Sequence, residues 1–356
     1  MGTRARMLAP WLLLLVAGAV GWALLGLLGG AGISIAVLAL YYAAAGSSFN
    51  MVFGALGIFS LAQPVFLAAG AYTGVYMNQN FDVNPWLGLV LGALVAGAIA
   101  LPIGLASLRS SGAVMTALIT LIIAQAAVPI VAGIPALGGS AGLYVDVIGG
   151  GSLSQMQFAG GLPFARILLV MNVLIIAGLM WLARSRFGLW LQAIKDAPEA
   201  AAASGVPVFR TKLSLFVVSA MVAAPAGYVY AQYNLLVSTE LFLSFTALFQ
   251  VIIVALVGGS ARPWGTAVGA LVVVWLAQFI TSVTNARPGV GPLTFAGVFL
   301  VIAVVLPRGL SGTWELLVNR RRRRTVTSDG PPSGGTSDPG VPDRTVAALG
   351  PRENVT

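Results

Sequence analysis

Long runs of apolar residues dominate this chain, and they limit its possible folds more than any other feature. A helix needs about 20 apolar residues to cross the hydrocarbon core of a bilayer. Runs of this kind, bounded by Gly, Pro, Asn or charged residues, occupy residues 11–29, 33–53, 57–77, 86–107, 113–134, 164–183, 213–234, 243–260, 264–283 and 292–307. We therefore predict an all-α, polytopic integral membrane protein with about ten transmembrane helices.

The shortage of charged and reactive residues excludes most chemistry. Only 8% of the 356 residues are charged, whereas a soluble domain carries roughly 25%. The chain has neither Cys nor His, which removes disulfides, thiolate zinc sites, imidazole bases and the usual haem ligands. We expect no catalytic residues, no metal site and no cofactor, so the protein is not expected to be an enzyme.

The predicted spans also lack an internal energy source. No Asp, Glu or Lys falls in the interior of any span, although transporters driven by ion gradients place such groups there as relays. Lys195 and Lys212 are the only lysines, and neither follows the glycines of a phosphate-binding loop. Uphill transport would therefore need a separate ATPase. The alternative is a passive, channel-like facilitator.

Basic residues predict the orientation in the membrane. If the N-terminus is cytoplasmic, ten crossings place 17 of the 19 Lys and Arg residues inside, leaving Arg166 and Arg287 at the outer face. Both termini are then cytoplasmic, in the inner (plasma) membrane. The net charge of +9 thus reflects membrane orientation and does not indicate nucleic-acid binding. The connection 135–163 is predicted outside, and the connection 184–212, with seven charges, inside.

The chain divides into two predicted regions. Residues 1–318 hold the apolar runs and form a transmembrane permease domain. Residues 319–356 are rich in Pro, Gly and Ser and too poor in apolar residues to bury a core, so we expect a disordered cytoplasmic tail.

The loop 184–212 carries a local helix signal. Pro198 suits the first turn of a helix, six helix-tolerant residues follow, Gly205 suits a left-handed cap, and Pro207 prevents continuation. This pattern predicts a short helix of about two turns with Glu199 at its positive N-terminal end. The pattern fits both a protein-docking surface and a simple Ala-rich connector.

These residues resemble a known family. Glu199-Ala200-Ala201, followed by three residues and Gly205, is similar to the coupling loop of ATP-binding-cassette (ABC) importer permeases. Ser185 to Gly188 and Gln192 to Asp196 resemble, more narrowly, the permeases of branched-chain amino acid (Liv-type) importers. Further similarities are Gly70-Ala71-Tyr72-Thr73, Gly138 to Leu143, and Pro307 to Leu310, so the resemblance covers about residues 40–312.

The resemblance implies a function and partners. It implies the ABC-importer permease fold, two ABC ATPase subunits, a second homologous permease subunit and an extracytoplasmic substrate-binding protein, all assembled around the lipid bilayer. The ATPase-coupling loop would comprise Ala193, Glu199, Ala200, Ala201 and Gly205. Related sequences have Ser-Leu-Gly-His where this chain has Ser60-Leu61-Ala62-Gln63. Urea, short amides and sugars therefore remain alternative substrates.

Uncharged polar residues at membrane depth are the candidates for a substrate pathway. Such groups must face protein or water, because unsatisfied polar groups in hydrocarbon cost several kcal/mol. Gln63 precedes Pro64, which suggests a broken helix that frees a carbonyl group. Gly70 and Gly74 have the spacing of close helix packing, which is an alternative to a pathway role. The candidate pathway residues are Ser60, Gln63, Gly70, Tyr72 and Gln125.

Overall fold

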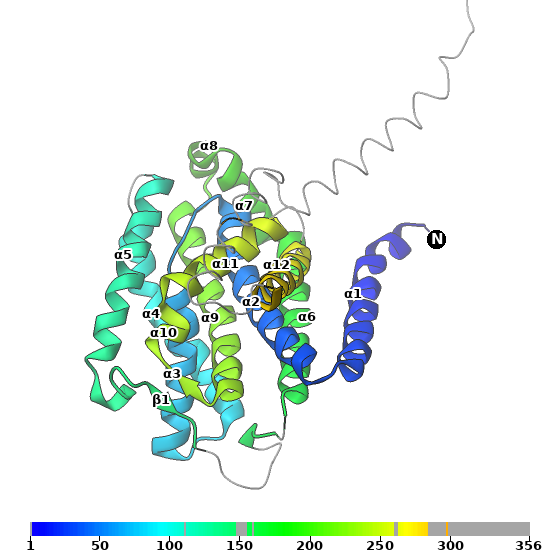
Figure 1. Ribbon diagram of the computed structural model, residues 1–356. Coiled ribbons are helices and arrows are strands. Elements are labelled where there is room, and N and C mark those ends of the chain that lie inside the picture. The colour runs from blue at the N-terminus through cyan, green and yellow to red at the C-terminus, as the bar shows by residue number, and fades with distance from the viewer. Residues whose placement is uncertain are drawn as a thin grey trace, which may run out of the picture. The chain divides into compact units, whose positions relative to one another are not determined.

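The computed structural model describes residues 2–109, 112–146, 155–158, 160–259 and 263–283, together with Gly297. All of them belong to one compact unit, Met1–Glu315 (Figure 1). The expected tail, 319–356, lies outside the described residues, as does the expected span 292–307 apart from Gly297.

The described unit is built from helices and one very small sheet. In chain order the elements are α1 (Gly2–Leu27), α2 (Gly30–Leu56), α3 (Gln63–Phe81), α4 (Pro85–Leu108), α5 (Ala113–Ala132), the 3-10 turn η1 (Pro135–Leu137), β1 (Leu143–Tyr144), α6 (Leu162–Arg184), α7 (Arg186–Asp196), α8 (Pro198–Ala203), α9 (Val208–Asn234), β2 (Leu236–Val237), α10 (Thr239–Leu243), α11 (Phe245–Gly258) and α12 (Gly265–Val283). Apart from 292–307, each of the ten expected spans overlaps at least one of these helices, which confirms the all-α prediction.

Within the described residues, seven segments are long and apolar enough to cross a bilayer, and they lie in α1, α2, α4, α5, α6, α9 and the α10–α11 pair. The apolar part of α12 is shorter, Gly265–Ile280. Helix α3 is more polar, and it is buried continuously from Gln63 to Ala68. A helix enclosed by protein needs no apolar surface for lipid, which explains why α3 joins the bundle despite its composition.

Helices α2, α3, α4 and α9 form the centre of the bundle. Residues 39–49 of α2 are buried without interruption, because α6, α9, α11 and α12 pack around it. Helix α9 packs along α3 and α4 through glycines. A Cβ added to Gly227 would lie 2.1 Å from the Leu67 carbonyl oxygen, so only a glycine fits there. Helices α1 and α5 pack at the edges, against α6 and against α4 and α10 respectively (Figure 1).

The structure corrects the expected span 57–77. Gly57 ends α2 in a left-handed conformation (φ +69°), and α3 begins only at Gln63. Pro64 therefore lies in the first turn of α3, where its missing N–H is not needed, and it does not break a helix. The partly buried backbone between the helices is supported by α5, since Leu61 N–H donates to Thr120 Oγ1 at 3.0 Å.

Other local features depend on contacts that the apolar runs do not reveal. The expected span 243–260 is divided at Ser244, whose side chain accepts from the Ala247 N–H and caps α11. The connection after α5 returns to the bundle through β1, which pairs antiparallel with β2, Leu143 opposite Val237.

Candidate functional site

The connection between α6 and α9 is an elbow of two short helices, α7 and α8. Ser185 starts α7 as an N-cap, because its Oγ accepts from the Gly188 N–H at 3.1 Å. Leu191 and Ile194 are buried on one side of α7, whereas Leu189 is exposed on the opposite side. This arrangement holds one face of α7 against the bundle and leaves the opposite face uncovered.

Helix α8 has the form that its sequence predicts. Pro198 occupies the first turn, and Gly205 follows the helix with φ +83°. The Gly205 N–H donates to Ala202 O at 3.0 Å, and the Val206 N–H donates to Ala201 O at 3.1 Å. These bonds satisfy the last carbonyl groups of the helix, as a glycine cap does.

Burial divides the predicted coupling residues into an anchor and a surface. Ala201 is buried, so it fixes α8 to the rest of the chain. Ala193, Glu199 and Ala200 are exposed, as is Gly205. A Cβ added to Gly205 would meet no atom within 4 Å. The elbow therefore presents small side chains and one carboxylate to any molecule that approaches it.

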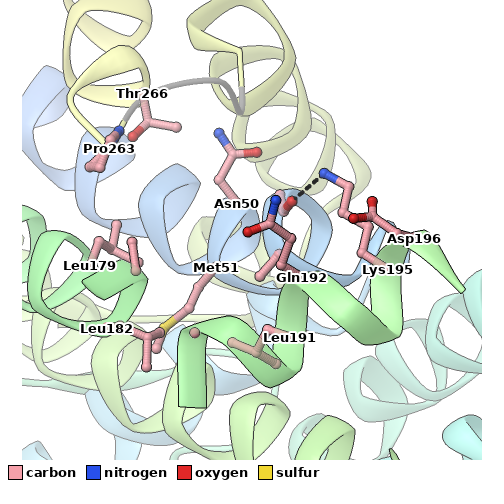
Figure 2. A pocket seen from close by; sticks show the side chains of 14 residues that line it. Asn50, Met51, Leu179, Leu182, Leu191, Gln192, Lys195, Asp196, Pro263 and Thr266 are labelled. Carbon is pink, nitrogen blue, oxygen red and sulfur yellow. Dashed lines mark hydrogen bonds between the residues drawn. The ribbon is translucent and has the colours of Figure 1, made fainter. Parts of the chain in front are cut away.

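A cavity of about 430 Å³ separates α7 from the bundle core (Figure 2). Lys195 crosses its edge, and its Nζ donates to the Gly54 carbonyl oxygen of α2 at 2.7 Å. The lining includes Asn50 and Met51 of α2, Leu182 of α6, and Leu191, Gln192 and Lys195 of α7. This cavity lies directly beside the elbow.

A buried cluster of polar side chains joins α2, α3 and α9. Ser48 Oγ lies 2.9 Å from Gln63 Oε1 and 2.6 Å from the Ser219 carbonyl oxygen. Gln63 is 1% exposed, and its Nε2 has no partner. Ser60 is equally buried, and its Oγ accepts from the Ala62 N–H at 3.4 Å. Two of the candidate pathway residues therefore lie close together in sequence and are both buried.

The other candidate pathway residues have different surroundings. Tyr72 lines a second cavity, of about 380 Å³, whose walls are otherwise mostly apolar, and its buried hydroxyl has no partner. Gln125 also has a buried, unpartnered Nε2. Gly70 contacts the α9 backbone, because a Cβ there would lie 2.1 Å from the Ala224 carbonyl oxygen. Gly70 and Gly74 thus have the packing role that their spacing indicates.

The buried interior of the described residues is polar in places but uncharged. Its buried polar side chains are Ser, Thr, Asn and Gln, and no Asp, Glu, Lys or Arg is buried in the described ranges. The same ranges contain no group of acidic residues able to hold a metal ion. An interior of this kind can accept a ligand through hydrogen bonds, but it offers no charged relay.

Comparison with known proteins identifies the family. Residues 31–306 match the model of a family described as branched-chain amino acid transport system / permease component. The chain belongs to this family. Two relatives, the high-affinity branched-chain amino acid transport system permease proteins LivM of Escherichia coli (strain K12) and Salmonella typhimurium (strain LT2), are each 25% identical over 300 residues. The matches cover 78% of this chain and 69% of each relative. No solved structure matches the chain.

Membership of this permease family confirms the resemblance that the loop 184–212 indicates. The matched range, 31–306, includes α2 to α12 and leaves out α1. The chain is therefore a membrane-embedded permease component of a transport system.

Sequence reasoning missed α7 and the cavity beside it. Two signals mark α7: the capping residue Ser185, and the apolar Leu191 and Ile194 spaced along one helical face. The contribution of Asn50 to this cavity had no local signal, because it depends on the approach of α2 and α7.

Proposed function

We propose that this permease is the membrane subunit of an ABC importer for branched-chain amino acids. Two ABC ATPase subunits would drive it from the cytoplasmic side, and an extracytoplasmic binding protein would deliver the substrate. A second homologous permease would complete the membrane assembly in the inner membrane. Family membership and the LivM relatives support the substrate class.

The observation that carries the proposal is the geometry of α8. A coupling helix must offer a surface that another protein can approach closely, and it must be attached firmly enough to transmit force. The exposed Ala200 and Glu199 give α8 such a surface, whereas the buried Ala201 and the cap at Gly205 fix it to α9. Ala193 of α7 is exposed on the same connection and would belong to the docking surface.

An uncharged path suits a zwitterionic substrate. A branched-chain amino acid has no net charge and a small apolar side chain, so weak polar contacts allow it to enter and to leave. Ser60, Gln63 and Gln125 would supply such contacts, with the Tyr72 hydroxyl and the close packing at Gly70 shaping the path. Strong recognition would then fall to the binding protein, and ATP hydrolysis would supply the energy that the chain lacks.

The basic residues support the proposed orientation. The connection between α6 and α9 carries five basic residues, Arg184, Arg186, Lys195, Arg210 and Lys212. By the positive-inside rule, these residues favour a cytoplasmic position for the connection and for both termini. The connection between α5 and α6 would face the outside, where the binding protein docks.

Affinity purification in mild detergent tests the proposal. We expect an ABC ATPase to co-purify with the tagged wild-type chain. It should be lost with Ala200→Trp, which adds bulk to the exposed side of α8. The control Asn80→Trp alters an exposed residue at the C-terminal end of α3, on the opposite predicted face, and should retain the ATPase. A wild-type chain that brings no ATPase would exclude the importer and favour a facilitator.

A further inference from the structure

Helix α7 lies across the ends of two membrane spans. It begins directly after α6 ends at Arg184, and near its own end the Lys195 Nζ donates to the Gly54 carbonyl oxygen in the last turn of α2. Figure 1 shows α7 and α8 at the end of the bundle opposite β1. The 11 residues of α7 extend only about 16 Å. All of α7 therefore stays close to the level at which α6 and α2 leave the membrane.

The junction with α6 fixes the start of α7 at this level. Ser185 is extended, and its N–H donates to the Leu182 carbonyl oxygen at 3.1 Å. A Cβ added to Gly188 would lie 2.2 Å from the same carbonyl oxygen, so the first turn of α7 touches the last turn of α6. The beginning of α7 is therefore held beside the end of the span and does not extend away from it.

Two arginines mark the levels at which α6 meets the bilayer surfaces. The guanidinium carbon of Arg166, near the start of α6, lies 4.7 Å from the centre of the Trp22 ring, and that of Arg184 lies 5.9 Å from the centre of the Trp11 ring. At 1.5 Å per residue, the stretch from Arg166 to Arg184 is about 27 Å long, which matches a hydrocarbon thickness of about 30 Å. Arg184 is therefore at the level of the lipid head groups, and so is Trp181, one turn earlier and 67% exposed.

The first half of α7 presents both basic and apolar side chains. Arg186, Leu189 and Trp190 are exposed, and they span an arc of about 100° on the helix. The one acidic residue of α7, Asp196, follows about 15 Å further along the axis. That separation exceeds the screening length of about 8 Å at physiological ionic strength. At head-group level, a guanidinium flanked by Leu and Trp side chains matches the two parts of a phospholipid, its phosphate and its acyl chains.

We propose that residues 181–190 form a binding surface for an anionic phospholipid of the adjacent leaflet. The lipid phosphate would accept from the Arg186 guanidinium, and the positive charge of Arg184 would favour an anionic head group over a zwitterionic one. The exposed Leu189 and Trp190 would lie against the glycerol backbone and the upper acyl chains. Charge complementarity identifies this occupant, because the cytoplasmic leaflet has a negative surface potential that attracts basic residues next to a span.

A lipid bound here would steady the coupling helix. Helix α7 continues through Ala197 directly into α8, so an anchor at Arg186 limits how far α8 can move from the membrane. Ala193, which the proposed function assigns to ATPase docking, lies one turn beyond Leu189, so lipid and ATPase would meet adjacent parts of the elbow. Given the proposed function, anionic lipid should increase ATP-driven uptake. The lipid-binding surface itself does not depend on that function.

Native mass spectrometry of the full-length chain in mild detergent measures the lipid binding directly. Dioleoylphosphatidylglycerol should bind at least about fivefold more tightly than dioleoylphosphatidylcholine. Arg186→Gln should weaken phosphatidylglycerol binding about fivefold, the effect of one basic residue at an anionic surface. The control Arg210→Gln removes an exposed charge from the same connection, at the start of α9, and should bind phosphatidylglycerol as the wild type does. Both arginines are exposed, so both variants should fold.

Two further probes test the apolar half of the surface. Excess glycerol 3-phosphate should not displace phosphatidylglycerol, because it has no acyl chains to contact Leu189 and Trp190. Leu189→Asn changes an exposed side chain and should weaken phosphatidylglycerol binding. Displacement by glycerol 3-phosphate, or binding that Leu189→Asn leaves unchanged, would overturn the proposed surface.

The Arg186→Gln variant also separates a lipid from a protein partner. Unchanged phosphatidylglycerol binding by this variant, together with loss of the co-purifying ATPase, would overturn the lipid assignment and give this face to the ATPase. Phosphatidylglycerol binding that depends on Arg186, in a wild-type chain that brings no ATPase in affinity purification, would refute the proposed function and leave the lipid-binding surface standing.

Discussion

Replacing Gly70 by Ala tests whether this glycine packs helices or lines the substrate path. A Cβ at position 70 would lie 2.1 Å from the Ala224 carbonyl oxygen and 2.7 Å from the Ala224 Cα, whereas ordinary contacts begin at 3.4 Å. Both atoms belong to the backbone of α9 and cannot rotate away. Helices α3 and α9 must therefore separate by on the order of 1 Å, which also loosens the neighbouring contact between Gly74 and the Tyr228 ring.

The matched control is Gly178→Ala on α6, where an added Cβ would meet no atom within 4 Å. Both substitutions lie in helices and gain about 1 kcal/mol of helix propensity. The difference between the two variants therefore isolates overpacking, which costs about 1–3 kcal/mol. If overpacking lowers the free energy of unfolding by about 2 kcal/mol, the apparent melting temperature of Gly70→Ala in detergent should lie roughly 4–8 °C below that of Gly178→Ala.

Tryptophan fluorescence on heating, with size-exclusion profiles before the scan, measures this difference. Equal melting temperatures for the two variants would refute the packing account of Gly70. Equal melting temperatures with loss of uptake in Gly70→Ala alone would assign Gly70 to the substrate path instead.

Three further predictions concern the elbow and the topology. The Gly205→Val chain should insert normally but lose ATP-driven uptake, because the left-handed conformation at position 205 costs a β-branched residue more than about 1–2 kcal/mol. The control Gly205→Asn should retain part of the uptake. Normal transport by Gly205→Val would exclude a coupling role for this cap. Glu199→Lys should weaken ATPase stimulation by reversing the charge at the N-terminus of α8, measured as ATP hydrolysis by the reconstituted complex against wild type. Because the chain has no native cysteine, single cysteines introduced at Ser140 and Ser204 report the topology. An impermeant thiol reagent should label the cysteine at position 140 in intact cells and the cysteine at position 204 only after permeabilisation. The reverse result would contradict the proposed orientation.

Elements set by local rules were predictable from the sequence. Apolar runs of sufficient length form helices because backbone groups in lipid must bond within their own segment. Helix α8 was equally predictable, since Pro198 and Gly205 set its two ends through their own backbone preferences. The small-residue spacing of Gly70 and Gly74 correctly indicated a close helix contact.

Features that depend on distant contacts were not predictable in the same way. The stretch before Gln63, where α3 begins, is held by a hydrogen bond from the Leu61 N–H to Thr120 of another helix. The cavity beside the elbow arises where Lys195 reaches Gly54, 141 residues earlier in the chain. Residue types alone also did not separate Gly70, which packs against α9, from Tyr72, which lines a cavity.

Radiolabelled uptake in cells tests the central claim most directly. Deleting this permease should reduce uptake of leucine, isoleucine and valine and leave uptake of urea and sugars unchanged. The wild-type chain should restore uptake, whereas a Gly205→Val chain inserted at the same level should not. Unchanged branched-chain amino acid uptake in the deletion strain, together with lost uptake of urea or a sugar, would contradict the assigned substrate.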